Sequence, residues 1–137
     1  MQRLSFQRAS RLRRKEAKQL LSSGCFSGAY YLAGYAVECG LKTCIAKQFK
    51  CNDLPDKVLV ARAYTHNLEA LLNLAGLETE LRDAMTQSRA LEVNWVAVKD
   101  WRVDVRYDTD KTREQATDFL TACFSRSGVR RWIMKRW

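Results

Sequence analysis

The chain has few of the residues that form loops, cross-links or metal sites. Its 137 residues include one proline, six glycines and a single histidine, His66. With no low-complexity tract and no repeat at a fixed period, the sequence offers no signal for a linker between domains. We therefore expect residues 1–137 to form one domain, a size at which a chain buries roughly two-thirds of its unfolded surface.

The five cysteines are an odd number and contain no C-x-x-C pair. Because only one histidine could complete a ligand set, this pattern argues against a zinc site, and it also argues against a disulfide framework. Free thiols are typical of a reducing compartment, so we expect a cytoplasmic protein without metal or cofactor.

The sequence also lacks the short motifs of common catalytic and nucleotide-binding sites. It contains no G-x-S-x-G, no Walker loop, no G-x-G-x-x-G and no H-E-x-x-H. His66 could act as a general base, but it lies between Thr65 and Asn67 at a predicted helix start, where we expect a hydrogen bond to the backbone instead. We assign no catalytic residue from these patterns.

No apolar run reaches the ~18 residues that a membrane-spanning helix needs. Glu38 and Lys42 interrupt the most apolar segment, residues 28–49. We therefore expect no association with a membrane.

Positive charge is concentrated at the two ends of the chain. The net charge is +9; residues 1–22 hold seven basic side chains and one acidic one, and residues 126–137 hold five basic side chains and no acidic one. Clustered positive charge indicates a phosphate-bearing or acidic partner, and the alternative is a solvated surface without a dedicated ligand. The expected basic surface comprises Arg11, Arg13, Arg14, Lys15, Lys18, Arg130, Arg131, Lys135 and Arg136.

Hydrophobic periodicity predicts an all-α fold, an antiparallel bundle with short connections. Apolar residues recur at helical spacing and nowhere alternate with period two over a sustained stretch. Ser27 is the predicted N-cap of a helix over 28–49, Gly76 the C-cap of a helix that begins near Asn67, and Thr112 with Gln115 a capping box. Residues 50–65 are ambiguous, and residues 88–107 mix helical turns with irregular chain.

The predicted helix over 28–49 has two unusual arcs. At about 100° per residue, four small residues share one side and four polar or aromatic residues share the other. The small arc, which allows close approach of another backbone, is Ala29, Ala33, Ala36 and Gly40, and the polar arc is Tyr31, Tyr35, Glu38 and Lys42. We expect the polar arc to line a groove or a subunit boundary; the alternative is an ordinary solvated Glu–Lys pair. We also expect a homodimer through the small-residue or the tyrosine face of this helix, because the helix has too little polar surface for a fully solvated position.

A second polar cluster lies at residues 101–108. Arg102 and Arg106 are four residues apart, next to Trp101, Tyr107 and Asp108. Guanidinium groups bind phosphate in a fork and aromatic faces stack on bases, so this pattern indicates a nucleotide or phosphate site. The alternative is an Arg–Asp network that supports the bundle, with Trp101 and Tyr107 in the core.

Taken together, these residues resemble the HEPN family of small helical proteins. The resemblance runs over nearly the whole chain and is most specific at residues 29–42. It is carried by Phe6, Leu12, Ala17, Leu20, Leu21, residues 28–38, Leu41, Lys42, His66, Asn67, Leu68, Asn94, Trp95, Trp101, Arg106 and Tyr107. Membership would imply a bundle of four to five helices, usually dimeric and encoded beside a minimal nucleotidyltransferase. Some members are metal-independent ribonucleases, often toxins, and others bind nucleotides or act as scaffolds.

The chain departs from the catalytic members of that family. Arg106 lies where their arginine lies, but the histidine that follows it after four to six residues is absent, and Lys111, Thr112 and Arg113 occupy this stretch. Without histidine the usual acid–base mechanism lacks a proton carrier. The resemblance therefore implies a nucleotide- or RNA-binding protein, or a nucleotidyltransferase partner, without nuclease activity. The alternatives are a toxin ribonuclease that uses Tyr107 or Lys111 as proton carrier, and a protein-interaction scaffold.

Overall fold

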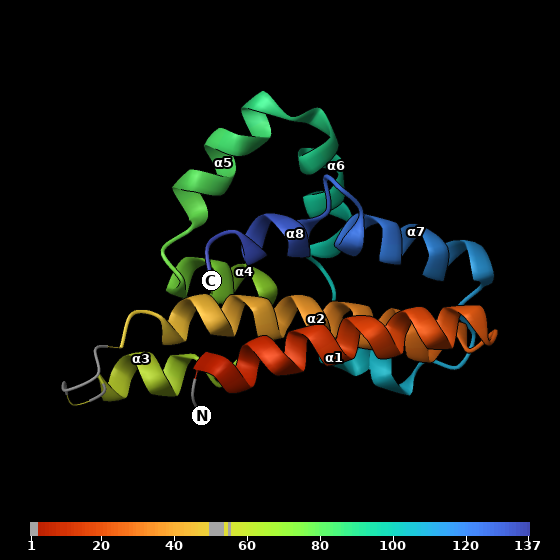
Figure 1. Ribbon diagram of the computed structural model, residues 1–137, viewed down its shortest axis with the longest axis horizontal. Coiled ribbons are helices and arrows are strands. Elements are labelled where there is room, and N and C mark those ends of the chain that lie inside the picture. Colours follow the sequence, from red (N-terminus) through yellow and green to blue (C-terminus); the bar gives the residue numbers. More distant parts are fainter. Residues whose placement is uncertain (1–2, 50–53, 55) are drawn as a thin grey trace.

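The protein is all-helical over the residues that the computed structural model describes, which are 3–49, 54 and 56–137 (Figure 1). This confirms the predicted all-α class for the described part of the chain. The elements are α1 (Arg3–Ser22), α2 (Phe26–Ala46), α3 (Lys57–Arg62), α4 (Leu68–Leu74), α5 (Glu78–Gln87), α6 (Arg89–Val98), the 3₁₀ helix η1 (Val103–Tyr107), α7 (Arg113–Phe124) and α8 (Val129–Met134).

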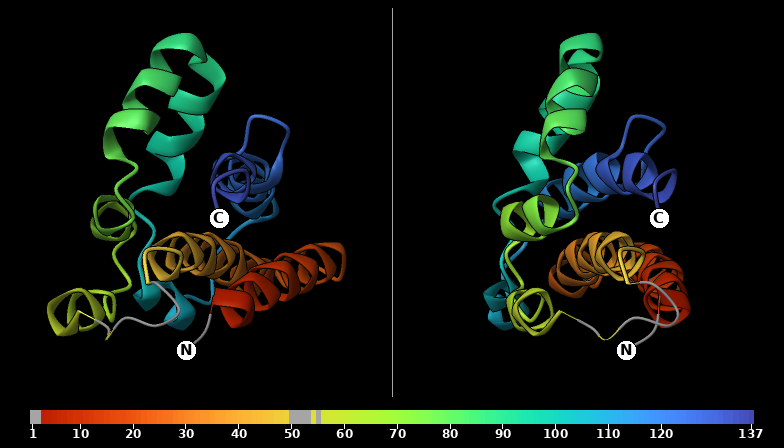
Figure 2. Two further views of the ribbon diagram at one scale, coloured as in Figure 1. Left: turned by 60° about the vertical axis from the view of Figure 1, so that its left-hand side comes forward. Right: turned by 90° about the vertical axis from the view of Figure 1, so that its left-hand side faces the viewer.

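Helix α2 lies at the centre of the bundle. It runs antiparallel to α1, and α7 and α8 lie across this pair in a second layer (Figure 1). Helix α2 also contacts α4 and η1. Helices α5 and α6 form a hairpin that projects from the bundle on the side away from α1 (Figure 2). Most of the elements that could form a site are therefore positioned by α2.

The predicted helix ends are mostly found. Thr112 and Gln115 form the capping box of α7, and Gly76, with φ of 72°, follows the end of α4 in the left-handed conformation that favours glycine. The Ser27 prediction is wrong, because α2 begins at Phe26 and its N-cap is Cys25, two residues before Ser27; the helix also ends at Ala46, three residues before the predicted end. The Ser27 hydroxyl instead accepts a hydrogen bond from the Lys111 backbone N–H at 3.1 Å, which ties the start of α2 to the segment before α7.

The small-residue arc of α2 is filled from within the chain. Ala29, Ala33 and Ala36 are fully buried. The Ser10 hydroxyl of α1 donates to the Ala36 carbonyl oxygen at 2.8 Å, and a Cβ at Gly40 would lie 3.2 Å from Ile133 of α8. The close approach that these small residues permit is therefore used by α1 and α8, and this face is not open to a second copy of the chain.

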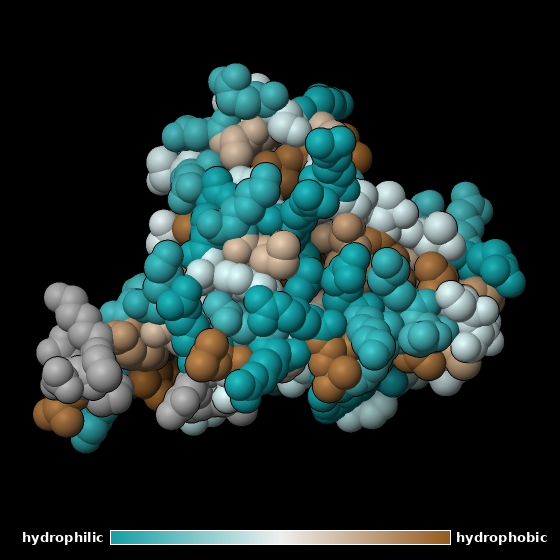
Figure 3. Space-filling model, in the orientation of Figure 1, coloured by the Kyte–Doolittle hydropathy of each residue, from teal (hydrophilic) through white to brown (hydrophobic). Residues whose placement is uncertain are grey.

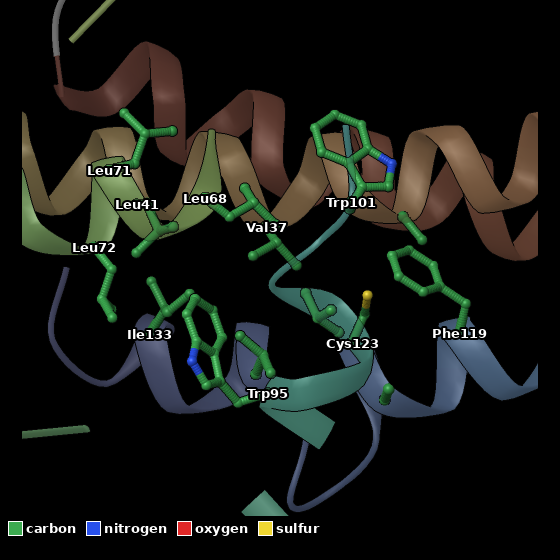
Figure 4. Close-up of a cluster of buried hydrophobic side chains, with 14 of the residues drawn as sticks. Val37, Leu41, Leu68, Leu71, Leu72, Trp95, Trp101, Phe119, Cys123 and Ile133 are labelled. Atoms are coloured by element: carbon green, nitrogen blue, oxygen red, sulfur yellow. The ribbon is translucent and has the colours of Figure 1, made fainter. Parts of the chain in front are cut away.

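The buried apolar side chains form a cluster between α2 and the second layer (Figure 4). Val37 and Leu41 of α2 meet Leu68 and Leu71 of α4, and Ile133 approaches from α8. None of the helices in the described residues combines the length and the hydrophobicity that a membrane span requires.

Candidate functional site

Glu38 is the most unusual residue of the polar arc, because its carboxylate is almost completely buried. Its side chain is 2 % exposed, and its Oε1 lies 3.5 Å from Lys42 Nζ. The same oxygen contacts His66 Nδ1 from the segment before α4. A buried carboxylate requires partners of this kind to offset its desolvation. The solvated Glu–Lys pair is thus the wrong interpretation of this spacing.

Among the described residues, the His66 side chain makes no hydrogen bond to the backbone, contrary to the prediction from the sequence. Its neighbours perform that function, because the Thr65 hydroxyl accepts from the Asn67 N–H and the Asn67 side chain caps α4 by accepting from Ala70 N–H at 2.9 Å. The imidazole side chain is 48 % exposed. The contact uses Nδ1, so Nε2 is the ring nitrogen left for another partner. No spacing in the sequence pointed to the Glu38–His66 contact, since the two residues are 28 positions apart.

Trp101 is a core residue, and its predicted role as a stacking platform is wrong. The residue is 3 % exposed and lies over Gly34 of α2. The Tyr31 ring stacks beside the Trp101 ring with centroids 6.1 Å apart, and the Tyr35 ring lies 6.0 Å from Tyr31. In the described residues, the Trp101 Nε1 has no hydrogen-bond partner. The indole therefore supports the aromatic end of the polar arc and has no face open to a base.

Helix α1 places Arg13 beside the polar arc of α2. The Arg13 guanidinium lies 5.9 Å from the Tyr35 ring centroid and pairs with Glu16 at 2.7 Å. The pKa of Tyr35 is raised, first by burial and then by the neighbouring Cys39 and Glu38. The Tyr35 hydroxyl therefore stays protonated at neutral pH, as it would with its ordinary pKa of 10.0.

The rest of the predicted cluster at residues 101–108 is partly exposed, and its two arginines do not lie on one face as expected. Arg106 donates to the Tyr107 hydroxyl at 3.0 Å and stacks on its ring at 4.9 Å, while Tyr107 is 71 % exposed. Arg102 lies outside η1 in extended backbone. At about three residues per turn in a 3₁₀ helix, a four-residue spacing does not bring two side chains to one face as it does in an α-helix.

Asp108 is not part of an arginine network. It pairs with Lys111 at 3.4 Å, and Lys111 also lies 4.5 Å from the Tyr30 ring centroid. Among the described residues, neither Arg102 nor Arg106 lies within ion-pair distance of an acid. Arg106 with Tyr107 therefore remains accessible to a ligand, whereas the Arg–Asp network finds no support here.

The two basic ends of the chain meet where side chains of α1 contact Arg130 of α8 and the C-terminal Trp137. Arg3 Nη2 of α1 donates to the Trp137 carbonyl oxygen at 2.5 Å. Arg130 is 6 % exposed, so its predicted place on the surface is wrong. Its Nε donates to Ser10 Oγ at 2.9 Å, and Ser10 in turn donates to Ala36 O. Arg130 is thereby linked through α1 to the central helix.

Two more arginines lie close to Arg130. The Trp137 ring is contacted by both Arg11, at 5.2 Å, and Arg130, at 5.4 Å, and Arg14 lies 5.7 Å from the Phe124 ring. The pKa of Arg130 is lowered to about 10, by burial first and then by the positive charges of Arg14 and Arg11. We call Arg11, Arg14 and Arg130 the arginine cluster. Within the described part of the chain, none of the three forms an ion pair with an acidic side chain.

The other predicted basic residues differ in their surroundings. Arg136 pairs with Glu80 of α5 at 2.7 Å and stacks on Trp132 at 3.7 Å, so part of its charge is neutralised. Figure 3 shows mostly hydrophilic side chains on the face where α1 lies toward the viewer. Of the nine residues of the predicted basic surface, those that are exposed are Arg11, Lys15, Lys18, Arg131 and Lys135.

Metal chemistry finds no support in the described residues, which contain no group of three or more His, Cys, Asp or Glu side chains that could hold an ion. The single histidine is held by Glu38, and Lys42 contacts the same carboxylate.

Comparisons of the chain with models of protein families, with curated proteins and with solved structures find no match.

Proposed function

We propose that the chain is a HEPN-like RNA-binding protein that holds backbone phosphates at the arginine cluster and does not cleave its ligand. The observation that carries this proposal is the buried guanidinium of Arg130 beside Arg11 and Arg14, without an acidic partner in the described residues.

Such an arrangement is unfavourable in the free protein. Burial removes water from the Arg130 guanidinium, and two like charges nearby disfavour its charged form further. A phosphate group reverses both effects, because it supplies negative charge and accepts hydrogen bonds from guanidinium forks. For an arginine that served only as a solvated surface charge, this burial would cost free energy without any compensating contact.

The cluster is also oriented for a ligand. The hydrogen bond from Nε to Ser10 fixes one edge of the Arg130 guanidinium, and in the described residues Nη1 and Nη2 make no hydrogen bond to the protein. Arg11 and Arg130 both lie against the ring of Trp137, which restricts their side chains. Preorganised donors lose little entropy on binding, so they favour phosphate over a diffuse counterion layer.

RNA binding at this cluster should depend strongly on salt and little on sequence. Phosphate contacts release counterions and position the chain without reading bases. The test is a fluorescence-anisotropy titration of labelled single-stranded RNA at several salt concentrations. Arg11→Glu with Arg14→Glu should weaken binding and flatten the salt dependence, by roughly 0.7 in the log–log slope for each phosphate that the variant no longer neutralises.

The matched control is Arg62→Glu, a charge reversal of an exposed arginine on α3. It changes net charge by the same amount per site and should leave the slope unchanged. Equal losses in the control and in the cluster variant, or no RNA binding at low salt, would contradict the proposal.

A metal-independent ribonuclease is the second candidate, favoured by the contact between Glu38 and His66. A buried carboxylate that orients a half-exposed imidazole is a common arrangement for proton transfer. In such an enzyme His66, which lies far along the chain from Arg106, would supply the proton carrier that the sequence lacks after Arg106.

A further inference from the structure

Helix α8 carries basic side chains on a second side. Arg130 faces α1, whereas Arg131 and Lys135 line a cleft between α8 and the α5–α6 hairpin. The cleft has a volume of about 280 Å³. Arg126, from the turn between α7 and α8, lines it as well.

The wall of this cleft is positive at one side and apolar at another. Arg126, Arg131 and Lys135 supply three cations, and no acidic residue is among those that line it. In the described part of the chain, none of the three makes an ion pair. The Trp132 ring and Leu91 supply apolar surface. A cleft with this composition selects a ligand that joins a negative group to a flat apolar one.

The walls are held in place by contacts outside the cleft. Arg136 stacks on Trp132 at 3.7 Å and is itself held by Glu80 of α5 at 2.7 Å. On the other side, Asn94 Nδ2 of α6 donates to the Ser127 carbonyl oxygen at 2.8 Å, which ties the turn before α8 to the hairpin. The aromatic and cationic groups are therefore presented from braced elements.

We propose that this cleft binds a mononucleotide, with the phosphate on Arg131, Lys135 and Arg126 and the base against Trp132. Guanidinium and ammonium groups bind phosphate, and an aromatic face accepts any nucleobase. The volume of about 280 Å³ lies just below the ~300–1,000 Å³ range of ligand pockets, which suits at most one nucleotide and is too small for an oligonucleotide.

This site is separate from the arginine cluster and does not rest on RNA binding there. Arg131 and Lys135 line the cleft, and the cluster residues do not. A ligand in the cleft meets side chains of α5, α6 and α8, whereas RNA at the cluster meets α1 and α8.

The test is isothermal titration calorimetry of the full chain with AMP and UMP, with the corresponding nucleosides and with inorganic phosphate. Both nucleotides should bind, the nucleosides should bind at least roughly tenfold more weakly, and so should phosphate alone. Arg131→Gln with Lys135→Gln should weaken AMP binding by at least about tenfold. Because both residues are exposed, the variant should keep its circular dichroism spectrum.

The matched control is Arg11→Gln with Arg14→Gln, which removes the same charge from the arginine cluster. It should lower AMP affinity much less than the cleft variant does, because it removes only a partly screened charge on the other side of α8, while weakening RNA binding. No binding of AMP at millimolar concentration, or equal AMP affinity in the wild type and the Arg131→Gln, Lys135→Gln variant, would overturn the proposal. Phosphate that binds as tightly as AMP would overturn the role of Trp132, and Trp132→Leu, with lost affinity for AMP but not for phosphate, would support it.

Discussion

The indole of Trp101 occupies the position that a side chain at Gly34 would need. A Cβ placed on Gly34 would lie 2.2 Å from both Cε2 and Nε1 of Trp101 (Figure 4 shows the indole against α2). Real Cβ atoms do not approach other atoms so closely. Glycine at this position therefore allows the segment before η1 to close over the central helix.

Gly34→Ala should lower the free energy of unfolding by about 1–3 kcal/mol, because the new methyl group displaces a buried indole. The better helix propensity of alanine, worth about 1 kcal/mol, offsets only part of this loss. Chemical denaturation of both proteins measures the difference. Gly28→Ala is the control, since its Cβ would lie 3.2 Å from the flexible end of Leu20, and it should be close to neutral. Equal effects of the two substitutions would contradict the role given to Trp101.

Glu38→Ala should destabilise the fold by about 3 kcal/mol, because it removes the partner of a largely buried Lys42 and of His66. Glu78→Ala is the control: Glu78 is 56 % exposed and pairs with Arg82 at the same four-residue spacing, so its loss should stay within about 0.5 kcal/mol. Urea denaturation measures both values. A loss at Glu38 as small as the control loss would show that the carboxylate is not buried in solution.

Purified protein should not cleave single-stranded RNA above background, and Arg106→Ala should change nothing in that assay. The reason is the missing histidine after Arg106. A gel assay with chelator present measures cleavage. Metal-independent cleavage that Arg106→Ala or His66→Ala abolishes would instead establish the ribonuclease candidate.

Thiol reactivity should separate the exposed cysteine from the buried ones. Cys25 is exposed, whereas burial raises the pKa of Cys39 to about 12, of Cys44 to about 11 and of Cys123 as well. In a Cys51→Ser background, a chromogenic disulfide at mildly alkaline pH should modify one thiol quickly and the other three only on unfolding. Rapid modification of all four would contradict the described burial.

The same thiols should make the fold sensitive to alkali. Unfolded thiols ionise near their ordinary pKa of 9.0, whereas folded Cys39 and Cys44 hold their protons to about pH 12 and 11. Stability is therefore full below about pH 9 and should fall above it, by up to about 1.4 kcal/mol per pH unit for each thiol. Denaturation at about pH 8 and about pH 10 measures this loss, and Cys44→Ala should reduce the difference.

We expect a homodimer through the tyrosine side of α2. Tyr31 and Tyr35 are half-buried, and the opposite small-residue arc is already covered by α1 and α8. Light scattering at roughly tens of micromolar protein, a concentration that detects even micromolar affinity, should give the mass of a dimer. Tyr35→Glu should give a monomer. A wild-type monomer at this concentration would contradict the expectation.

Local features of the fold could be predicted, because they depend on residues close together in sequence. Helical periodicity located α1, α2 and α7, and the capping box at Thr112 was recognisable from two residues three apart. The Glu38–Lys42 pair followed from one turn of helix. Its burial did not, because burial depends on how α4 and its preceding segment pack on α2.

The tertiary features of the candidate sites could not be predicted in the same way. Arg130 and Arg131 are adjacent and chemically identical, yet one is buried against Ser10 and the other lines an open cleft. Which of the two arginines is buried depends on how α8 packs in the tertiary structure, and this cannot be read from two adjacent residues. The burial of Trp101 was equally hard to predict. Arg102 and Tyr107 suggested an exposed cluster, whereas the indole packs on α2 because Gly34 has no side chain in its way.

The narrow width of α8 links its two sides energetically. An α-helix is about 10–12 Å across with its side chains, close to the ~8–10 Å Debye length at ordinary ionic strength. An anion at Arg130 and another at Arg131 would therefore sense each other through incomplete screening, and each would reduce the positive potential that attracts the other. Mononucleotide and RNA should thus weaken each other's affinity by the same factor, a reciprocity that thermodynamic linkage requires, and added salt should reduce that factor toward one.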